Sequence, residues 1–214
     1  MPPGFRCSRS RTAKGQWGDS MKVLVLNGCS DEKSATQDLL KGICDGIPAP
    51  HEIAWINLHG LAIQSCQKCH KCFPCGECVL PEDDAHAVAR SMFSADALII
   101  GLQASPQDIH IAVERLFERC MSAMAFKTPQ GDFRPWRQGR FAILACHEAC
   151  CVAVNESKSP QADSSSVAKA LEIGGFNLIK VTTQAKTGQA RDDFFPVEKA
   201  RSLGCSLSCI MIPR

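Results

Sequence analysis

Short, almost purely apolar runs alternate along the chain with segments whose apolar residues recur at helical spacing. An uninterrupted apolar run suits a strand buried on both faces, and a three-to-four-residue spacing suits an amphipathic helix. The predicted strands are 22–28, 51–58, 95–102, 140–146 and 177–183. The predicted helices are 34–46, 83–95, 108–120, 166–176 and 197–211. This strict alternation predicts an α/β fold, a three-layer sandwich in which helices cover both faces of a parallel sheet.

The chain length predicts one domain, because 214 residues suffice for a sizeable α/β core but not for two full domains. Residues 1–20 contain Pro, Gly, Ser and basic side chains without apolar periodicity, so we expect a flexible N-terminal extension. Met21 is a candidate for the true start. The domain is then 21–214, including a cysteine-rich loop at 65–82.

The charge balance argues against a polyanionic partner. A net charge of +2 without a recurring basic stripe favours small solutes over nucleic acid or an anionic membrane surface. No run approaches the length of a membrane span, and no apolar segment follows the N-terminal charges as a secretory signal would require. We therefore expect a cytoplasmic protein.

The loops after the first, third and fourth predicted strands are the candidate site. In doubly wound sheets the ligand crevice lies at the carboxyl ends of the strands, where the strand order reverses. The loops at these ends are 28–36, 101–108 and 146–151. The first carries Ser30, Ser34 and Thr36, whose hydroxyls suit phosphate contacts, although an ordinary helix N-cap explains them nearly as well.

Cysteine is concentrated in one stretch. Of the 14 cysteines, five lie in CQKCHKCFPCGEC, residues 66–78. In a reducing compartment such residues are thiols or metal ligands, and iron in a cubane cluster is held by four thiolates at short spacings. Zinc is the alternative metal, although four-cysteine zinc sites usually separate their two pairs by a dozen or more residues. A cysteine-rich loop without metal is the third reading.

The stretch IQSCQKCHKCFPCGECVLPEDD resembles the compact cysteine motif and paired acidic residues of the iron–sulfur flavoproteins, within the NADPH-dependent FMN reductase group. The resemblance extends from Met21 to the last helix. It implies a flavodoxin-like doubly wound sheet of five parallel strands with the cysteine-rich loop inserted. It also implies cluster ligation by Cys66, Cys69, Cys72 and Cys78, which leaves Cys75 as an extra thiol.

The same resemblance implies FMN at the three loops. GCSDEKSAT is similar to the family's phosphate-binding segment, GLQASPQD to the segment that contacts the flavin ring, and ACHEACC takes the place of a third, glycine-rich contact. The chain departs from the pattern at Asp31, where the family usually has Arg, and in having no tyrosine. The implied cofactor-binding residues are Cys29, Ser30, Ser34, Ala35, Thr36, Gln103, Ala104, Ser105, Pro106, Cys146, His147 and Glu148.

Several other polar residues have simpler interpretations. Asp83 and Asp84 are better explained as a helix N-terminus than as a catalytic carboxylate pair. Arg115, Glu118 and Arg119 are predicted to form a solvated helix face. The adjacent pair Cys150 and Cys151 fits either a redox-active or a buried position.

The resemblance predicts an electron-transfer oxidoreductase that passes electrons between FMN and a 4Fe-4S cluster, with NAD(P)H as the candidate donor. No side chain is required as a general acid or base, because the cofactors carry the chemistry. The expected partners are a small electron donor or a redox protein, in a homodimer or homotetramer. The alternative is a non-enzymatic zinc-binding or scaffold protein that keeps the fold and has lost FMN.

Overall fold

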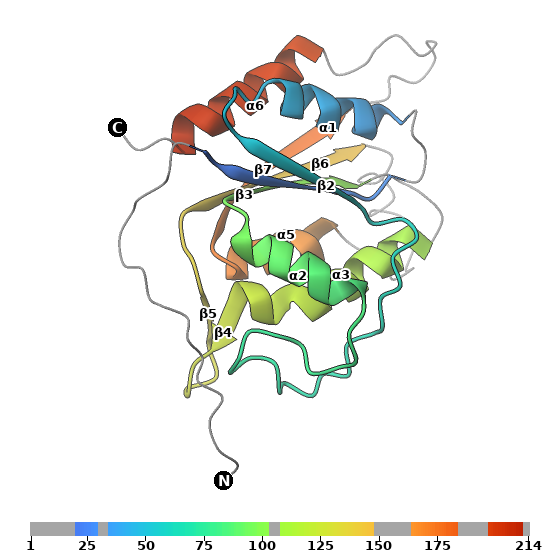
Figure 1. Cartoon of the computed structure of the whole chain (residues 1–214), viewed down its shortest axis with the longest axis vertical. Helices are drawn as coiled ribbons and strands as arrows, with labels where there is room; N and C mark the ends of the chain where they lie inside the picture. The colour runs from blue at the N-terminus through green and yellow to red at the C-terminus, as the bar shows by residue number, and fades with distance from the viewer. Residues whose placement is uncertain (1–19, 30–33, 103–107, 148–163, 184–196, 212–214) are drawn as a thin grey trace.

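A five-stranded parallel sheet lies between two layers of helices in the structure, a computed structural model (Figure 1). It describes residues 20–29, 34–102, 108–147, 164–183 and 197–211. The strands are β1 (Lys22–Asn27), β2 (Glu52–Asn57), β3 (Ala97–Leu102), β6 (Arg140–His147) and β7 (Phe176–Thr183). Their spatial order, β2-β1-β3-β6-β7, is that of flavodoxin-like folds, so the predicted fold class is confirmed.

Five helices cover the two faces of the sheet in the described part of the chain. Helices α1 (Ala35–Asp45) and α6 (Val197–Met211) pack on one face. Helices α2 (Asp84–Ser94), α3 (Asp108–Met124) and α5 (Ser164–Ile173) pack on the other. Figure 1 shows the two layers above and below the sheet.

Side chains from the central strands fill the cores on both faces. In β1, Val23 and Val25 point toward α1 and α6, while Leu24 and Leu26 point toward the opposite helix layer. Every residue of β3 is buried. This is the packing that the continuous apolar runs predict, because a strand covered on both sides has no solvated face.

A short antiparallel hairpin follows α3 and was not predicted. Strands β4 (Ala125–Lys127) and β5 (Phe133–Pro135) form it. Trp136 joins it to the end of α3, because its indole Nε1–H donates to Ser122 O at 2.7 Å. Strands of three residues are too short to show a periodic pattern, so periodicity could not predict them.

Two further predictions concern the N-terminal extension and the absence of a membrane span. Residues 1–19 lie outside the described part of the chain, so the flexible extension stays a prediction. Among the described helices, none combines the length and the apolar character needed to cross a bilayer.

The crossing of α1 and α6 depends on glycine, which gives a stability prediction. A Cβ atom at Gly204 would lie 2.0 Å from Ile43 O, a backbone atom that moves only with its helix. We expect Gly204→Ala to lower the free energy of unfolding by about 2–3 kcal/mol, because overpacking a close contact forces the helices apart. Chemical denaturation measures the change. Ser206→Ala, on the exposed side of α6, is the control and should stay within about 0.5 kcal/mol; equal stability of the two variants would contradict this packing.

Candidate functional site

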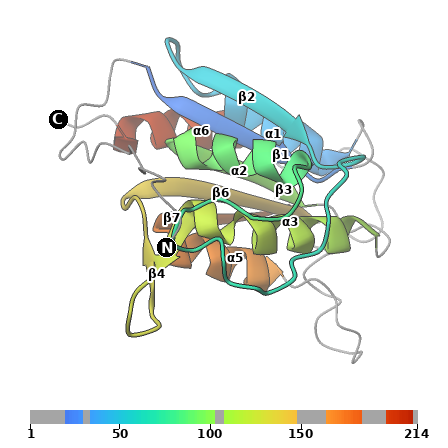
Figure 2. The same ribbon diagram turned by 60° about the horizontal axis from the view of Figure 1, so that its bottom comes forward.

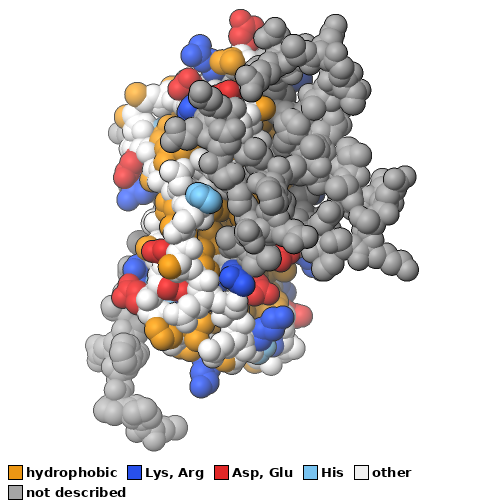
Figure 3. All heavy atoms as spheres, turned by 90° about the vertical axis from the view of Figure 1, so that its right-hand side faces the viewer, with side chains coloured by type: hydrophobic (Ala, Val, Ile, Leu, Met, Phe, Trp, Pro, Cys, Tyr) orange, Lys and Arg blue, Asp and Glu red, His pale blue; other side chains and the backbone are white. Residues whose placement is uncertain are grey.

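The strand order reverses between β1 and β3, which places the candidate crevice at their carboxyl ends. The chain goes from β1 to β2 on one side and returns to β3 on the other. The two backbones come close there: Gly28 N–H donates to Gly101 O at 2.9 Å, and a Cβ at Gly28 would lie 2.7 Å from that oxygen. Figure 3 views the molecule from this side, with hydrophobic side chains among polar ones in the described part.

Asn27 organises the end of β1, and the sequence interpretation missed it. Its side chain is buried, and its Nδ2 donates to Asn57 Oδ1 at 3.0 Å on the neighbouring β2. Its Oδ1 accepts from the Cys29 backbone N–H at 3.1 Å. The signal for Asn27 in the sequence was a polar residue at the end of an apolar strand. Asn27 therefore fixes the direction in which the chain leaves the sheet.

The first turn of α1 presents an unsatisfied hydroxyl. Ser34 is the N-cap, and its Oγ accepts from Gln37 N–H at 3.2 Å, which confirms the N-cap interpretation of this residue. Thr36 is 1% exposed, and its Oγ1 has no hydrogen-bond partner among the described residues. The backbone N–H groups of Ala35 and Thr36 have no acceptor within the helix, as at any helix N-terminus. This turn thus offers donors to an anion.

The remaining predicted flavin residues lie only partly within the described part of the chain. Cys29 and Cys146 are described, and both are buried, at the ends of β1 and β6. The backbone of His147 ends β6, but its side chain lies outside the description. The other predicted contacts in these loops, and the undecided cysteine pair, also lie outside the described residues: Ser30, Gln103, Ala104, Ser105, Pro106, Glu148, Cys150 and Cys151.

The cysteine-rich loop leaves β2 and runs beneath α2 and α3 (Figures 1 and 2). Its ends are fixed to the N-terminus of α2. Ala62 N–H donates to Asp84 Oδ2 at 2.6 Å, and Gln64 N–H donates to Asp83 Oδ2 at 3.0 Å. On the return, the carbonyl of Cys78 lies 3.1 Å from His86 Nε2. The loop is therefore anchored where it begins and where it ends.

Three of the five thiols are gathered beside α3. Cys66, Cys72 and Cys78 are partly buried, whereas Cys69 and Cys75 are exposed. Burial raises the pKa of the Cys72 thiol, a hydrogen bond with Ser122 opposes the rise, and the nearby negative charges of Cys78 and Cys66 add to it. Cys66 and Cys78 are thus each near enough to Cys72 to affect its thiol.

The loop backbone turns between successive cysteines. Lys68, His70 and Gly76 have positive φ angles of 52°, 57° and 77°. The first two are not glycine, and such residues rarely adopt the left-handed region without a local reason. Lys68 N–H also donates to Cys66 Sγ at 3.4 Å, and hydrogen bonds to ligand sulfurs are a feature of iron–sulfur sites.

The donor chemistry of the loop fits a thiolate-bound metal, but the thiols are not fully assembled. Among the described residues, no group of three or more Cys, His, Asp or Glu side chains converges as a metal site. Cys69 points to solvent, and Cys75 Sγ donates to the carbonyls of Cys72 at 3.4 Å and Glu77 at 3.3 Å. Cys75 is therefore turned toward the backbone of its own turn.

A buried ion pair connects α2 to α3 above the loop. Arg119 Nη1 donates to Asp83 Oδ2 at 2.8 Å, and Nη2 donates to Asp83 Oδ1 at 3.0 Å. The Asp83 side chain is 6% exposed and that of Arg119 0% exposed. The prediction of a solvated face is correct for Arg115 and Glu118 but wrong for Arg119, because its side chain turns toward Asp83.

Asp83 has the predicted capping role and also accepts hydrogen bonds from Gln64 and Arg119. It is the N-cap of α2, accepts from Ala85 N–H at 3.2 Å, and forms a capping box with His86. Burial acts to raise the pKa of the Asp83 carboxyl, but hydrogen bonds from Gln64 N–H and Arg119 outweigh it, so the pKa lies below its usual value. His86 Nδ1 accepts from Asp83 N–H at 3.1 Å, so we assign the ring proton to Nε2, which donates to Cys78 O.

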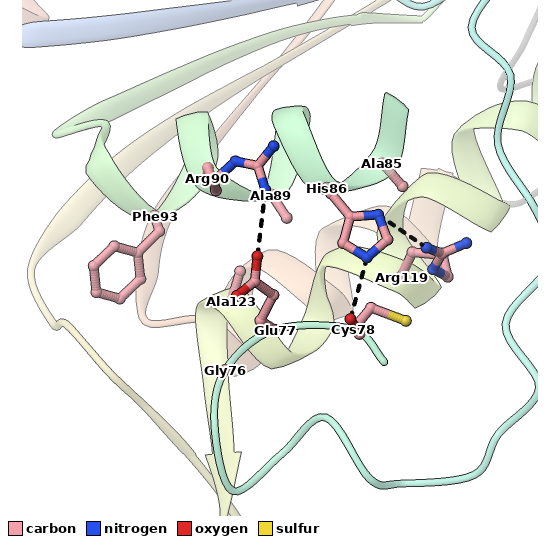
Figure 4. Close-up of a pocket in the computed structure, with 10 residues that line it drawn as sticks. All are labelled: Gly76, Glu77, Cys78, Ala85, His86, Ala89, Arg90, Phe93, Arg119 and Ala123. Atoms are coloured by element: carbon pink, nitrogen blue, oxygen red, sulfur yellow. Dashed lines mark hydrogen bonds and ion pairs between the residues drawn. The ribbon is translucent and has the colours of Figure 1, made fainter. Parts of the chain in front are cut away.

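A small cavity of about 200 Å³ lies between this network and the loop (Figure 4). Phe93 and small residues of α2 and α3 give it an apolar wall. Arg90 stands at its edge and pairs with Glu77 at 3.3 Å and Glu82 at 2.8 Å, all three side chains being more than half exposed. The cavity is a space beside Cys78 and is too small for a flavin.

The comparisons with known proteins reveal similarity in structure only. No model of a protein family matches the chain, and no curated protein sequence does. An NAD(P)H:quinone oxidoreductase from Methanothermobacter marburgensis matches with a TM-score of 0.63 and 20% identity, over 88% of this chain and 99% of that one. An FMN-dependent NADH-azoreductase from Bacillus anthracis, in complex with FMN, matches with a TM-score of 0.64 and 13% identity, over 88% and 99%.

A third structure, RosB with bound 8-demethyl-8-formylriboflavin-5'-phosphate, matches with a TM-score of 0.60 and 15% identity, over 89% of this chain and 78% of that one. At these identities the likeness establishes the flavodoxin-like fold. The function of the site depends on this chain's own residues.

Proposed function

We propose that this protein is an electron-transfer oxidoreductase of the iron–sulfur flavoprotein type, with FMN at the carboxyl ends of β1 and β3 and a 4Fe-4S cluster on the cysteine-rich loop. The observation that carries the flavin half is the buried hydroxyl of Thr36 in the first turn of α1, which has no hydrogen-bond partner in the described part of the chain. A buried unpaired hydroxyl costs free energy, and a phosphate oxygen would satisfy it.

The first turn of α1 would hold the FMN phosphate. The backbone N–H groups of Ala35 and Thr36 and the helix dipole favour an anion there. Ser34 can donate its hydroxyl proton to phosphate while its oxygen still accepts from Gln37 N–H. Two of the structures similar to this chain contain a flavin phosphate, which supports the choice of ligand.

The loops after β3 and β6 would contact the flavin ring. We retain the proposal that Gln103, Ala104, Ser105 and Pro106 line one side. Cys146, His147 and Glu148 would approach it from β6, and Cys29 and Ser30 complete the phosphate end. FMN supplies hydride and single-electron transfer when bound, so the chain has only to bind and orient it. NAD(P)H is the proposed donor.

Cys66, Cys69, Cys72 and Cys78 are the proposed cluster ligands. Cys66 and Cys78 lie near enough to Cys72 to raise the pKa of its thiol, and the left-handed turns at Lys68 and His70 lie between the first three of the proposed ligands. Cys69 would have to turn inward to complete the set. Four thiolates in so short a segment suit a cubane cluster better than a zinc site with widely separated pairs.

The separation of the two sites favours an oligomer. Helix α3 begins next to the loop after β3 and reaches the cysteine-rich loop at Arg119, roughly 16 Å along its axis at about 1.5 Å per residue. Within one chain the loop thus lies beneath the helices rather than at the strand ends. We propose a homodimer or homotetramer that brings the cluster of one protomer toward the flavin of another, in the cytoplasm.

A substitution at Thr36 tests the flavin site, because it should raise the stability of the FMN-free protein and lower its affinity for FMN. Thr36→Val removes the unpaired hydroxyl, so the FMN-free protein should become more stable, with a higher Tm. The same change should raise the Kd for FMN by about tenfold or more, because a hydrogen bond to a charged group is lost. Thr36→Ser, which keeps the hydroxyl, is the control and should bind like the parent protein. A higher Tm with unchanged FMN affinity would place the phosphate elsewhere.

The alternative is a zinc-binding or scaffold protein that keeps the fold without FMN. It is favoured by the departures in the crevice loops, namely Asp31 in place of Arg and the absence of tyrosine. Metal analysis distinguishes the two: stoichiometric zinc without acid-labile sulfide supports the alternative, and iron with sulfide supports the oxidoreductase.

A further inference from the structure

Strand β2 forms an exposed edge of the sheet. In the described part of the chain its only neighbouring strand is β1, and Figure 2 shows it along one margin of the sheet. No residue of β2 is buried, whereas every residue of β3 is. An edge strand presents a row of backbone donors and acceptors to which another strand can pair. Strand β2 is therefore a candidate interaction surface.

Alternate residues of β2 direct their backbone groups outward. In a parallel pair, every second residue of a strand makes both of its backbone hydrogen bonds to the neighbouring strand. Glu52 N–H donates to Met21 O at 2.9 Å, so the even-numbered residues of β2 bond toward β1. The N–H and carbonyl groups of Ile53, Trp55 and Asn57 therefore point away from the sheet.

The features that usually block an edge strand are missing from β2. Edge strands of soluble proteins commonly carry Lys, Pro or a bulge that prevents pairing with another chain. The β2 sequence EIAWIN contains neither Lys nor Pro, and its register with β1 is continuous from end to end. Trp55, in the middle of the outward residues, is 39% exposed. A large exposed aromatic side chain on an unblocked edge is typical of a surface that a partner covers.

A second copy of β2 fits this edge in one register. An antiparallel copy with Trp55 opposite Trp55 places Ile53 opposite Asn57, so every outward residue has a partner within the strand. In each such pair the two residues exchange both hydrogen bonds. A shift by two residues in either direction pairs at least one outward residue with a position outside β2. Glu52, the one charged residue of β2, then lies opposite Leu58, so no like charges meet.

We propose that β2 is a homodimer interface, in which two copies pair antiparallel about a two-fold axis at Trp55 and join their sheets. Trp55 lies on the same face of the sheet as Ile53, which packs against the core beneath α1 and α6, so the two Trp55 rings meet on that face. A strand of a different protein is the other occupant of such an edge. The symmetry of the outward residues favours a second copy, because an isologous contact uses one surface twice.

Charge substitutions at the axis test this interface by sedimentation velocity of the FMN-free chain under reducing conditions. We expect a dimer for the parent protein. Trp55→Lys and Trp55→Glu each place two like charges opposite each other and should raise the dimer Kd by about thirtyfold or more. An equimolar mixture of the two variants should restore the dimer, because opposite charges then meet on the axis. Val79→Lys adds the same charge at an apolar residue that is 51% exposed outside β2, and should dimerise like the parent.

Amide hydrogen exchange tests the register in the parent protein and needs no substitution. The N–H groups of Ile53 and Trp55 should exchange at least about tenfold faster when the protein is diluted below the dimer Kd, because dilution exposes them. The N–H groups of Ala54 and Ile56 bond to β1 in the monomer, so their exchange should not depend on protein concentration. Exchange at Trp55 that is equally fast in dimer and monomer would overturn the proposed pairing.

Failure of this inference and failure of the proposed function give different results, because the interface requires neither FMN nor a metal. A dimer that persists in both Trp55 variants with the parent Kd overturns the β2 interface and leaves the proposed oligomer standing. A parent protein that is monomeric at about 1 mM overturns the interface and the oligomer together. In either case the iron, sulfide and FMN contents are measured independently. If the Trp55 variants do not fold, the exchange experiment on the parent protein decides.

Discussion

Replacing Cys72 by serine should remove the proposed cluster from the cysteine-rich loop, whereas replacing Cys75 by serine should leave it in place. Cys72 is partly buried, with Cys66 and Cys78 near enough to affect its thiol, and it is the third of the four proposed ligands. Cys75 is exposed, and its thiol is directed to the carbonyls of Cys72 and Glu77 rather than to the other sulfurs. Serine keeps the shape of both side chains and removes only the soft ligand.

Iron content and visible absorption after anaerobic reconstitution measure this difference. We expect about four irons per chain in Cys75→Ser, as in the parent protein, and loss of most of the iron in Cys72→Ser. If Cys75 moves in to replace Cys72, the residual centre should be labile. Equal loss in both variants would show that the ligand set includes Cys75 and that our assignment is wrong.

Asp83→Asn should lower the free energy of unfolding by about 3–5 kcal/mol, because it leaves the buried Arg119 charge without its partner. The two side chains are 6% and 0% exposed, so water cannot replace the lost carboxylate. Glu82→Gln is the matched control. It removes the charge of the neighbouring residue, whose pair with Arg90 is largely exposed, and should change stability by less than about 1 kcal/mol.

Asp83→Asn should also change how steeply the free energy of unfolding falls as the pH is lowered. The pKa of Asp83 is lowered by folding, despite its burial, through hydrogen bonds from Gln64 and Arg119. Its contribution is therefore complete above the unfolded-state pKa of about 4 and is lost as the pH falls through the lower folded-state value. Denaturation measured from pH 7 down to pH 3 should show a shallower decline in Asp83→Asn. Parallel profiles for the two proteins would contradict the assignment.

The sheet could be predicted from the sequence because each central strand is an unbroken apolar run. A strand such as β3 has no solvated face, and its six buried residues leave no alternative to a covered parallel sheet. The hairpin of β4 and β5 could not be predicted, since three residues per strand are too few to establish an alternating pattern. A hydrogen bond from Trp136 to Ser122 holds the hairpin. The two residues are 14 positions apart, so a local sequence pattern does not show this contact.

The proposed ligands of the candidate site stay a prediction, and the residues that support the cysteine-rich loop were not predicted. The pattern predicts an exposed Arg119 because Arg115 lies four residues before it and three before Glu118, and Arg115 and Glu118 are exposed. A closer signal existed: Arg119 follows Leu116 by three residues, which puts it on the buried face, where a charge requires a partner. The partner, Asp83, lies 36 residues earlier, and only the fold brings the two together.

Chemical analysis of the anaerobically prepared protein tests the central claim most directly. Iron, acid-labile sulfide and released FMN are measured on the same sample, per chain, together with zinc. The account predicts about four irons and four sulfides, as a cubane held by four thiolates requires, and about one FMN. Stoichiometric zinc without sulfide, in a protein that retains no FMN, would contradict it.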